Sequence, residues 1–347
     1  MNIPWNNQSV FVIAEIGINH NGDPVLAHRL IDAAADAGAQ AVKFQTFVPE
    51  ECAHDAAGLT EDQKGRVDGS MLEMIRRLCL DGCHWRELKA HAEERGVLFF
   101  STPFDSPSLD TLLDLGVELL KVPSGELVNL PLIRRMAATG LPTIMSTGMS
   151  DLEETRRAVG LWWEANGGPL ALLQCTSAYP ARPEELNLRA MTTLRQAFHV
   201  VAGFSDHTLG HEAAVAAVAL GARIIEKHFT LDRAMQGPDH AASATPEDFH
   251  ELVDAIRRTE AALGDGVKRP VEREYAVREA ARRSLYFAAD LPEGHVLGET
   301  DLKALRPGTG FPVQRLEEIL HRPLSRDVRA GEAVTEAHVL APTALSR

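Results

Sequence analysis

The chain has 347 residues, of which 45% are hydrophobic and 24% are charged, and its formal net charge at pH 7 is −14. This length suits a barrel followed by a small module, and the composition is that of a globular protein able to bury a large core. The negative charge leaves no basic surplus for binding nucleic acid, although a few lysines in one pocket could still bind a small anion.

Neither export nor membrane insertion is indicated by the sequence. The polar segment 1–8 does not resemble a signal peptide, and no apolar run approaches the roughly 20 residues that span a bilayer. The four cysteines are too scattered for a disulfide framework. We therefore expect a cytoplasmic protein with free thiols and no membrane partner.

From the N-terminus onward, short apolar runs alternate with longer segments of helical spacing. Eight runs are predicted to be strands, at 10–14, 41–44, 97–100, 117–122, 142–145, 170–173, 200–202 and 223–225. Helices are predicted at 24–37, 83–95, 107–115, 130–138, 152–165, 188–197, 212–220 and 246–263, with another near 71–80 in the long polar stretch 45–81. Because the apolar runs do not alternate with polar residues, each strand is expected to be buried on both faces, as in a parallel sheet.

Eight strand–helix units in about 260 residues predict an α/β fold of the closed (β/α)8 kind, a TIM barrel, rather than an open sheet. No Gly-x-Gly-x-x-Gly follows the first strand, so a dinucleotide-binding fold lacks its fingerprint. After Gly264 the sequence becomes charged and poor in aromatics, and from Ser284 its apolar runs are short and broken by Pro and Gly. The predicted parts are a catalytic barrel at 1–264, a linker that can be partly helical at 265–283, and a small β-rich domain at 284–347.

Polar side chains follow all eight predicted strands, at the end where TIM barrels place their active sites. In strand order they are Glu15; Lys43 and Gln45; Thr102; Lys121, Ser124 and Glu126; Ser146; Ser177 and Tyr179; Ser205, Asp206 and His207; and Glu226, Lys227 and His228. Solvated loops that happen to be polar would explain one or two such ends, but not all eight. We therefore expect an active site at this end of the barrel.

Three lysines, Lys43, Lys121 and Lys227, end buried strands and are expected to point into one mouth. A lysine in such a place is costly unless an anion or a carboxylate meets it. Each one alone could pair with a neighbouring glutamate. Three together, with serine and threonine hydroxyls between them, predict a site for a phosphorylated or dianionic ligand.

Two histidines, His207 and His228, end neighbouring strands and could hold one divalent cation through their imidazole nitrogens. A single histidine is more often a hydrogen-bonded core residue, but a pair at matching strand ends favours a metal. The adjacent Asp206 and Glu226 are candidate partners of these imidazoles.

Other ionisable residues at the same face have open roles. Glu15 and Glu126 end strands one and four near lysines, which would keep them ionised. Either could act as a general base, or could simply form salt bridges. His20 and His240 lie in polar loops and are alternative ligands or substrate contacts.

Nine ordered motifs resemble those of the sialic acid synthases and cover nearly the whole chain. They are AEIGINHNG at 14–22, VKFQT at 42–46, STPF at 101–104, PSGE at 123–126, STGM at 146–149, CTSAYP at 175–180, FSDHT at 204–208, IEKHFT at 225–230 and GPDH at 237–240. The C-terminal part, through Arg306-Pro-Gly-Thr-Gly310, resembles the antifreeze-like (SAF) domain of that family. One such motif would be a weak indication, whereas the ordered set is specific.

This resemblance implies a transferase that condenses phosphoenolpyruvate with N-acetylmannosamine and water to give N-acetylneuraminate and phosphate. It implies that water attacks carbon 2 of phosphoenolpyruvate, so that the C–O bond breaks, and that carbon 3 attacks the open-chain sugar aldehyde. It also implies a divalent metal, Mn²⁺ or Mg²⁺, that polarises this aldehyde. A domain-swapped homodimer is implied as well, in which Arg306 of one subunit contacts the N-acyl group in the barrel of the other.

The resemblance also implies roles for single residues by their motif positions. His207 and His228 match the metal ligands, and Glu15 and Glu126 match acidic positions near the reacting carbons. The positions around phosphoenolpyruvate are Lys43, Thr102, Lys121, Ser124, Ser146, Ser177 and Ser205, and the sugar-side positions are Gln45, Tyr179 and Asp239.

Two departures bear on the identity of the acceptor sugar. Ser177 stands where bacterial N-acetylneuraminate synthases often carry Asn, and PSGELVNLP at 123–131 looks closer to synthases of legionaminic acid, whose precursor is a 2,4-diacetamido trideoxy sugar. The first expectation is N-acetylmannosamine, with N,N'-diacetyllegionaminate synthase and then pseudaminate synthase as alternatives. Two readings from other classes are a non-catalytic carbohydrate-binding barrel and an aldolase that uses a lysine Schiff base.

Overall fold

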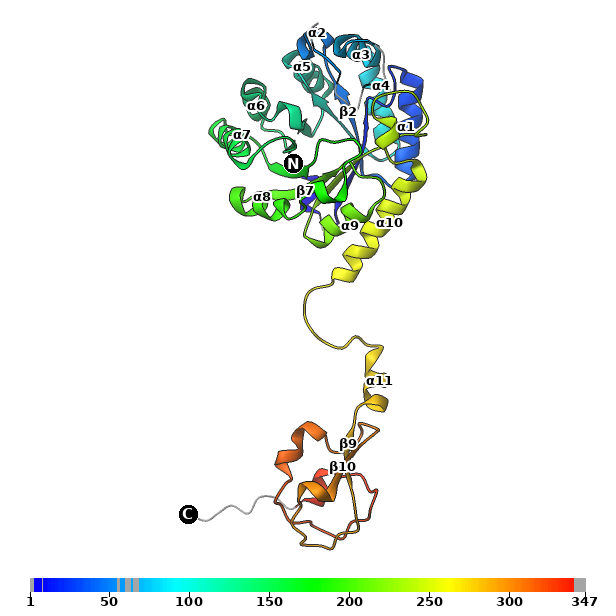
Figure 1. Ribbon diagram of the computed structural model, residues 1–347, viewed down its shortest axis with the longest axis vertical. Helices are drawn as coiled ribbons and strands as arrows, with labels where there is room; N and C mark the ends of the chain where they lie inside the picture. The colour runs from blue at the N-terminus through cyan, green and yellow to red at the C-terminus, as the bar shows by residue number, and fades with distance from the viewer. Residues whose placement is uncertain (1–2, 8, 55–56, 60–63, 65–68, 340–347) are drawn as a thin grey trace. The chain divides into compact units, whose positions relative to one another are not determined.

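A computed structural model describes residues 3–7, 9–54, 57–59, 64 and 69–339 of the chain. The chain divides into two compact units, Met1–Gly264 and Asp265–Arg347, coloured from blue to yellow and from yellow to red in Figure 1. In the described residues, no helix is long and apolar enough to cross a membrane. The cytoplasmic location stays a prediction.

The first unit is a closed barrel of eight parallel strands, as the sequence predicts. The strands are β1 (Phe11–Gly17), β2 (Ala41–Thr46), β3 (Leu98–Pro103), β4 (Leu120–Val122), β5 (Thr143–Ser146), β6 (Leu170–Cys175), β7 (Val201–Asp206) and β8 (Ile224–His228). They pair in chain order, and β8 pairs with β1 to close the barrel.

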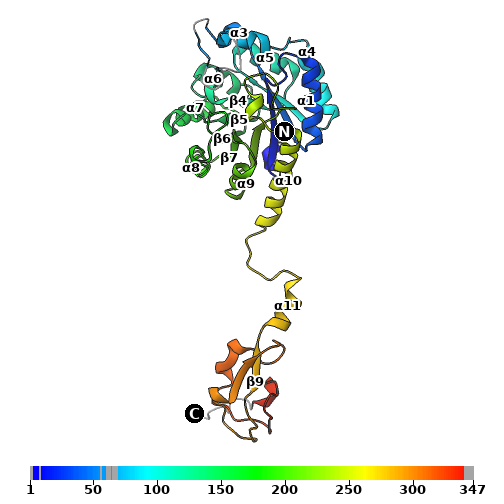
Figure 2. The ribbon, with the colours of Figure 1, turned by 45° about the vertical axis from the view of Figure 1, so that its right-hand side comes forward.

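Helices surround the barrel in Figures 1 and 2. They are α1 (Pro24–Asp36), α2 (Pro49–Cys52), α3 (Met71–Leu78), α4 (His84–Glu94), α5 (Ser106–Leu115), α6 (Leu130–Ala137), α7 (Leu152–Glu164), α8 (Ala190–Phe198), α9 (Glu212–Ala219) and α10 (Pro246–Leu263). Several strands run past their predicted ends. The first, for example, continues from Ala14 to Gly17, because the parallel ladder extends through the polar residues that follow the apolar run.

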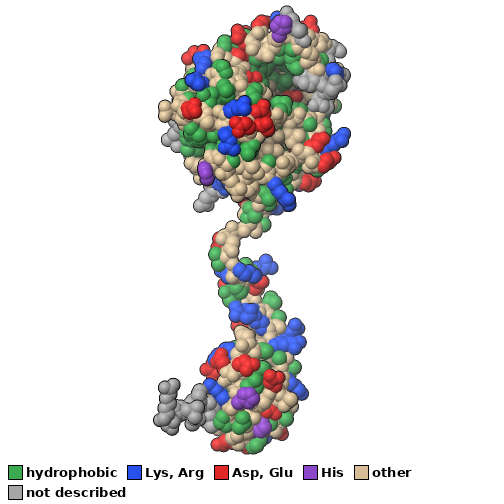
Figure 3. Space-filling model, turned by 60° about the vertical axis from the view of Figure 1, so that its left-hand side comes forward, with side chains coloured by type: hydrophobic (Ala, Val, Ile, Leu, Met, Phe, Trp, Pro, Cys, Tyr) green, Lys and Arg blue, Asp and Glu red, His purple; other side chains and the backbone are tan. Residues whose placement is uncertain are grey.

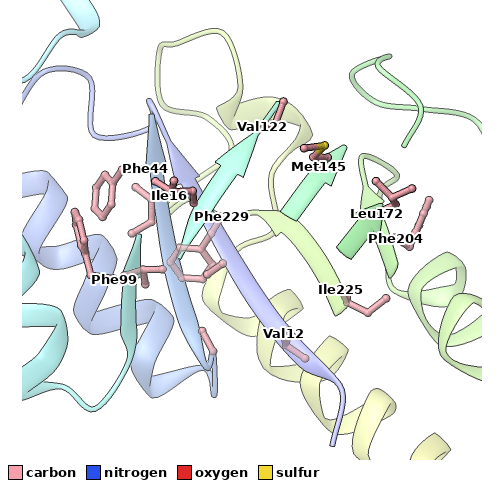
Figure 4. Packing of buried hydrophobic residues seen from close by; sticks show 14 of the residues in the cluster. Val12, Ile16, Phe44, Phe99, Val122, Met145, Leu172, Phe204, Ile225 and Phe229 are labelled. Atoms are coloured by element: carbon pink, nitrogen blue, oxygen red, sulfur yellow. The ribbon is translucent and has the colours of Figure 1, made fainter. Parts of the chain in front are cut away.

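Two layers of apolar side chains hold the barrel together, because successive side chains of a strand point to opposite faces. The outward residues pack beneath the helices, and Figure 4 shows Val12, Phe44, Phe99, Leu172 and Phe204 among them. The inward residues form a separate cluster that fills the lower part of the barrel. It consists of Trp5, Phe11, Ile13, Ala41, Phe100, Leu119, Ile144, Ala171, Leu173 and Ile224.

The second unit begins with an exposed segment that includes α11 (Glu274–Ala281), along which basic side chains are visible in Figure 3. Beyond it, β9 (Ser284–Phe287) pairs antiparallel with β10 (Leu302–Leu305). Isolated bridges and three short 3-10 helices, Glu299–Asp301, Val313–Glu318 and Glu336–His338, complete the fold. Its own small core includes Phe287, Leu297, Leu324 and Val334.

Candidate active site

A cavity of about 440 Å³ opens at the carboxyl ends of the barrel strands, and every strand contributes to it. Its lining includes thirteen of the residues predicted from the sequence: Glu15, Lys43, Gln45, Thr102, Lys121, Ser124, Ser146, Ser177, Tyr179, Ser205, His207, His228 and Asp239. The volume lies within the range of small-molecule sites. The structure therefore brings together most of the predicted residues in one place.

Strand alternation explains why these particular residues meet. In β1, Ile13 belongs to the inner apolar cluster and Glu15, two residues later, lines the cavity. The same step leads from Ile144 to Ser146 in β5 and from Ile224 to Glu226 in β8. Each strand thus carries an inward apolar residue below and an inward polar residue above it, and the apolar layer forms a closed floor under the cavity.

Two lysines and two glutamates alternate on this floor, and all four are buried. Lys43 Nζ lies 2.7 Å from Glu15 Oε2 and 3.8 Å from Glu226 Oε2, while Lys121 Nζ lies 3.7 Å from Glu226 Oε1. Lys43 also donates to Thr102 Oγ1 at 3.1 Å, and Lys121 donates to Ser146 Oγ at 2.6 Å. Glu226 therefore sits between the two cations, and hydroxyls surround all of them.

The two carboxyls respond to burial in opposite ways. Burial raises the pKa of Glu15 to about 7, because Lys43 offsets only part of the lost hydration. Burial also disfavours ionised Glu226, but Lys121 and Lys43 together outweigh it and lower the pKa of this carboxyl to about 2. At neutral pH, Glu226 is thus a fixed anion and Glu15 is close to the midpoint of its titration.

The hydroxyls of Ser124 and Ser177 lie close together above the floor because Gly148 lies between them. The Gly148 amide donates to Ser124 Oγ at 3.0 Å. A Cβ atom at this position would lie only 2.4 Å from Ser177 Oγ and 2.7 Å from Ser124 Oγ. Only glycine permits the loops after β4, β5 and β6 to approach this closely. Their hydroxyls and the lysines can together bind phosphate or carboxylate oxygens.

The two imidazoles lie side by side, with ring centroids 5.3 Å apart. His207 Nδ1 lies 2.7 Å from the Thr176 carbonyl, so it donates there, and Nε2 is the nitrogen that carries the lone pair when this ring is neutral. His228 Nδ1 is buried, has no hydrogen-bond partner in the described part of the chain, and lies 3.8 Å from Asp239 Oδ2. Burial and the neighbouring His207 hold the pKa of His228 well below its usual value, so this ring is neutral, as a metal ligand must be.

These donors fit a divalent cation. His228 offers an unprotonated nitrogen, and the carbonyl behind His207 fixes the tautomer of that ring in the way that metal-bound histidines usually require. Burial alone would lower the pKa of His207, but its contacts with Cys175 and the Thr176 carbonyl outweigh burial and raise it, so a bound cation would have to displace the second proton of this ring. Among the described residues, no group of three or more His, Cys, Asp and Glu side chains gathers as a ligand set. A cation held by the two imidazoles would therefore have positions open to water or a substrate oxygen.

Lys227 does not line the cavity, and the expectation that it points into the mouth is wrong. Its Nζ lies 2.8 Å from Asp206 Oδ2 and donates to the Thr208 carbonyl at 2.8 Å. Because β8 alternates, Glu226 and His228 face inward while Lys227 faces the other side. Asp206 accordingly pairs with Lys227 and not with an imidazole.

Glu226 lies in the cavity between the two lysines, whereas the sequence predicts it only as a strand-end residue and a partner of the histidines. The signal was present in the Glu-Lys-His order of β8, where residues two apart share a face. Cys175 also lines the cavity, with its Sγ 3.9 Å from His207 Nδ1.

Two further predicted residues lie outside the cavity lining. Glu126 is half-buried in the 3-10 helix Ser124–Glu126, where its carboxylate accepts a hydrogen bond from Asn129 Nδ2 at 2.6 Å. Arg306 belongs to the second unit and is exposed. The alternative ligands His20 and His240 are buried away from the cavity, and His240 Nδ1 lies 2.7 Å from Thr230 Oγ1.

One side of the cavity is apolar, which the strand-end analysis did not predict. We call this surface the apolar wall. It consists of Ile18, Phe47, Met71, Met74, Ile75, Leu78 and Phe104.

Comparison with known proteins gives matches over both units. A model of the NeuB family matches residues 30–268, and a model of the SAF domain matches residues 282–340. The N,N'-diacetyllegionaminic acid synthase of Legionella pneumophila is 42% identical over 340 residues, covering 96% of each chain. The enzyme of the same name from Campylobacter jejuni is 41% identical over 334 residues, covering 95% of this chain and all of that protein. The crystal structure of an N-acetylneuraminic acid (sialic acid) synthetase from Leptospira borgpetersenii, in complex with citrate, superposes with a TM-score of 0.70 at 38% identity, covering 78% of this chain and 90% of that one.

Proposed function

Because this chain belongs to the NeuB family of sialic and related nonulosonic acid synthases, we propose that it condenses phosphoenolpyruvate with 2,4-diacetamido-2,4,6-trideoxymannose. Water is the third reactant, and the products are N,N'-diacetyllegionaminate and inorganic phosphate. The observation that carries the proposal is a single cavity that combines a lysine and hydroxyl floor with a pair of imidazoles.

The choice of acceptor departs from the first expectation, N-acetylmannosamine. The two relatives named N,N'-diacetyllegionaminic acid synthase are similar over at least 95% of the chain. The relative named sialic acid synthetase is less similar and matches a smaller share. Together with the PSGELVNLP segment, this supports the legionaminate alternative better than N-acetylneuraminate synthesis.

Phosphoenolpyruvate would bind on the floor of the cavity. Lys43 and Lys121 would meet its phosphate and carboxylate, with the hydroxyls of Thr102, Ser124, Ser146, Ser177 and Ser205 as further partners. Since Glu226 is ionised between the two lysines, it keeps both of them charged before the substrate arrives. The floor is thus organised for a dianion in advance.

The acceptor would bind above phosphoenolpyruvate, with its aldehyde toward His207 and His228. These two residues would hold the metal, Mn²⁺ or Mg²⁺, which when bound polarises a carbonyl as a Lewis acid. Gln45, Tyr179 and Asp239 line the same region and would contact the sugar.

Glu15 is the residue we propose to move the proton. Its carboxyl lies on the cavity floor, 2.7 Å from Lys43, and its pKa of about 7 allows it to take a proton from the attacking water and to release it again. Glu126 lies beside the cavity rather than in its lining, which makes it the second candidate.

The site would be completed by the second unit of another subunit in a domain-swapped homodimer. Arg306 is exposed and belongs to a Pro/Gly-rich loop, and its side chain has no ion pair within the described residues. A guanidinium held in this way can donate hydrogen bonds to the acyl oxygen of the sugar.

The test is release of inorganic phosphate from phosphoenolpyruvate with Mn²⁺, first with the diacetamido sugar and then with N-acetylmannosamine. Release that depends on the diacetamido sugar, with a product of the mass of N,N'-diacetyllegionaminate, would support the proposal. Release with N-acetylmannosamine alone would show that the acceptor is N-acetylmannosamine, as first expected. No release with either sugar would favour a binding barrel, and a borohydride-trapped pyruvate adduct would indicate a Schiff-base aldolase.

A further inference from the structure

The apolar wall has no part in the chemistry proposed above, although it forms one side of the cavity mouth. Its residues come from the loops after β1, β2 and β3 and from α3. The residues that would contact the sugar or the metal come mainly from the other side, after β6, β7 and β8. They are Tyr179, His207, His228 and Asp239.

The wall is built into the fold of α3. This helix begins with a capping box, in which Ser70 Oγ accepts from the Glu73 amide and the Glu73 carboxylate accepts from the Ser70 amide. Met71, Met74, Ile75 and Leu78 then lie on one face at the spacing of helical turns. Met74 and Leu78 are 3% and 7% exposed and anchor the helix, while Met71 and Ile75 are half-buried and border the cavity.

Two polar side chains near the wall, Cys52 and Gln45, make contacts away from it. Cys52 Sγ lies 3.5 Å from Asp105 Oδ2, and Gln45 Nε2 donates to Glu15 Oε1 at 3.0 Å. The seven side chains of the wall carry no nitrogen or oxygen, so a hydroxyl placed against them would lose its water without gaining a hydrogen bond from them. A methyl group in the same place would gain from burial.

We propose that the apolar wall selects an acceptor whose carbon 6 is a methyl group rather than a hydroxymethyl group. This inference rests on the proposed function, in which the aldehyde of the open-chain sugar lies at the imidazoles. Carbon 6, at the other end of the sugar, then reaches the apolar wall on the opposite side of the cavity. Met71 and Ile75 are the residues that contact the methyl group. A purely apolar contact of this size discriminates against an added hydroxyl by about 10- to 100-fold.

The experiment compares two acceptors that differ in one oxygen atom, 2,4-diacetamido-2,4,6-trideoxymannose and its 6-hydroxy analogue, each with phosphoenolpyruvate and Mn²⁺. The quantity measured is the ratio of their kcat/KM values. We expect the wild-type enzyme to prefer the 6-deoxy sugar by about tenfold or more. Met71→Gln and Ile75→Gln, which place an amide at the wall and keep good helix formers in α3, should each reduce this preference at least threefold, by about 0.6 kcal/mol.

Leu113→Gln is the matched control, since Leu113 lies on α5, is 37% exposed and does not line the cavity. It should leave the ratio unchanged. Equal kcat/KM values for the two sugars in the wild-type enzyme, or a ratio that both wall variants leave unchanged, would overturn the inference while leaving the synthase activity in place. Failure of the proposed function would look different, because phosphate would then be released with N-acetylmannosamine but not with the diacetamido acceptor, or with none of the sugars.

Discussion

Glu15 and Glu226 are the same residue type on the same floor, both share Lys43, and yet they ionise more than four pH units apart, at about 7 and about 2. The cause is the number of cations near each. Glu226 has Lys43 and Lys121 within 4 Å and accepts from Ser205 Oγ at 2.9 Å, whereas Glu15 has Lys43 alone. Pairs of carboxyls whose environments separate their pKa values commonly divide the acid–base roles of an active site.

The raised pKa of Glu15 predicts a loss of stability with rising pH. Between the unperturbed value of 4.5 and about 7, the folded protein binds this proton and the unfolded chain does not. Stability therefore falls as pH rises through that window. Glu15→Gln cannot titrate, so relative to wild type it should gain up to about 3 kcal/mol between pH 5 and pH 8.

Urea denaturation of the metal-free proteins at the two pH values measures this difference. All four tryptophans lie in the barrel unit, so tryptophan fluorescence follows its unfolding. Parallel pH dependence in wild type and variant would show that Glu15 has an ordinary pKa. Glu226, by contrast, contributes stability that is lost only as pH falls from 4.5 through about 2, outside this window.

Lys121 and Lys227 provide a second residue-level prediction, because both are buried but face opposite sides of the barrel wall. Lys121→Met should raise the KM for phosphoenolpyruvate at least about tenfold, through loss of a charged contact in the cavity. Lys227→Met leaves Asp206, whose side chain is fully buried, without its cation, and should cost about 3–5 kcal/mol of stability. Its KM for phosphoenolpyruvate should stay within about twofold of wild type. A KM that rises equally in both variants would place Lys227 at the substrate after all.

At the scale of elements, the strands were the most predictable part of the molecule. Uninterrupted apolar runs such as 10–14 and 170–173 are typical of strands buried on both faces, and eight of them in alternation with helices predict a parallel sheet closed into a barrel. The carboxyl ends of those strands then locate Lys43, Lys121, His207 and the other lining residues.

The remaining parts of the site could not be read in the same way. The sequence predicts Lys227 in the cavity, whereas the structure has Glu226 there. The strand β8 continues past its apolar run, so the alternation of side chains along the strand, and not the end of the run, decides which side chain faces inward. The apolar stripe of α3 could equally have packed on the core, and nothing in its spacing shows that Met71 and Ile75 border a cavity. Tertiary contacts decide both cases.

Asp105 joins two elements, and its replacement should cost more than loss of a helix cap. Its carboxylate caps α5 through the Ser108 amide at 2.7 Å and also accepts from the Val48 amide at 2.7 Å, before α2. Asp105→Ala should therefore destabilise the barrel by about 2–3 kcal/mol, the sum of a cap and an unsatisfied, partly buried amide. Asp151→Ala removes an exposed cap from α7 and should cost about 1 kcal/mol in the same fluorescence assay. Equal losses would show that the link to Val48 contributes nothing.

At the scale of the whole molecule, the chain carries a catalytic barrel and a second unit with a core of its own. The predicted linker 265–283 has no buried residue in its helix α11, and its basic side chains contrast with the net charge of −14 of the whole chain. A segment of this kind does not by itself fix which barrel the second unit serves. The proposed domain swap therefore needs a test that distinguishes a subunit's own barrel from that of its partner.

Complementation between two impaired variants, assayed at phosphoenolpyruvate concentrations well below the KM of Lys121→Met, makes this distinction. Arg306→Ala keeps an intact barrel, and Lys121→Met keeps an intact second unit. If Arg306 serves the partner's barrel, a mixed dimer has one complete site, formed by the barrel of the Arg306→Ala chain and the arginine of the Lys121→Met chain. Random mixing by co-expression would then restore about a quarter of the wild-type activity per chain.

If Arg306 serves its own barrel, no chain in the mixture has a complete site, and the activity of the mixture should equal the mean of the two variants. When a single chain that carries both substitutions is co-expressed with wild type, each mixed dimer has one complete site if Arg306 serves its own barrel and none if Arg306 is exchanged. Full wild-type kcat from the wild-type chain of these mixed dimers would therefore count against the exchange. In an exchanged dimer, the wild-type barrel would receive alanine in place of Arg306.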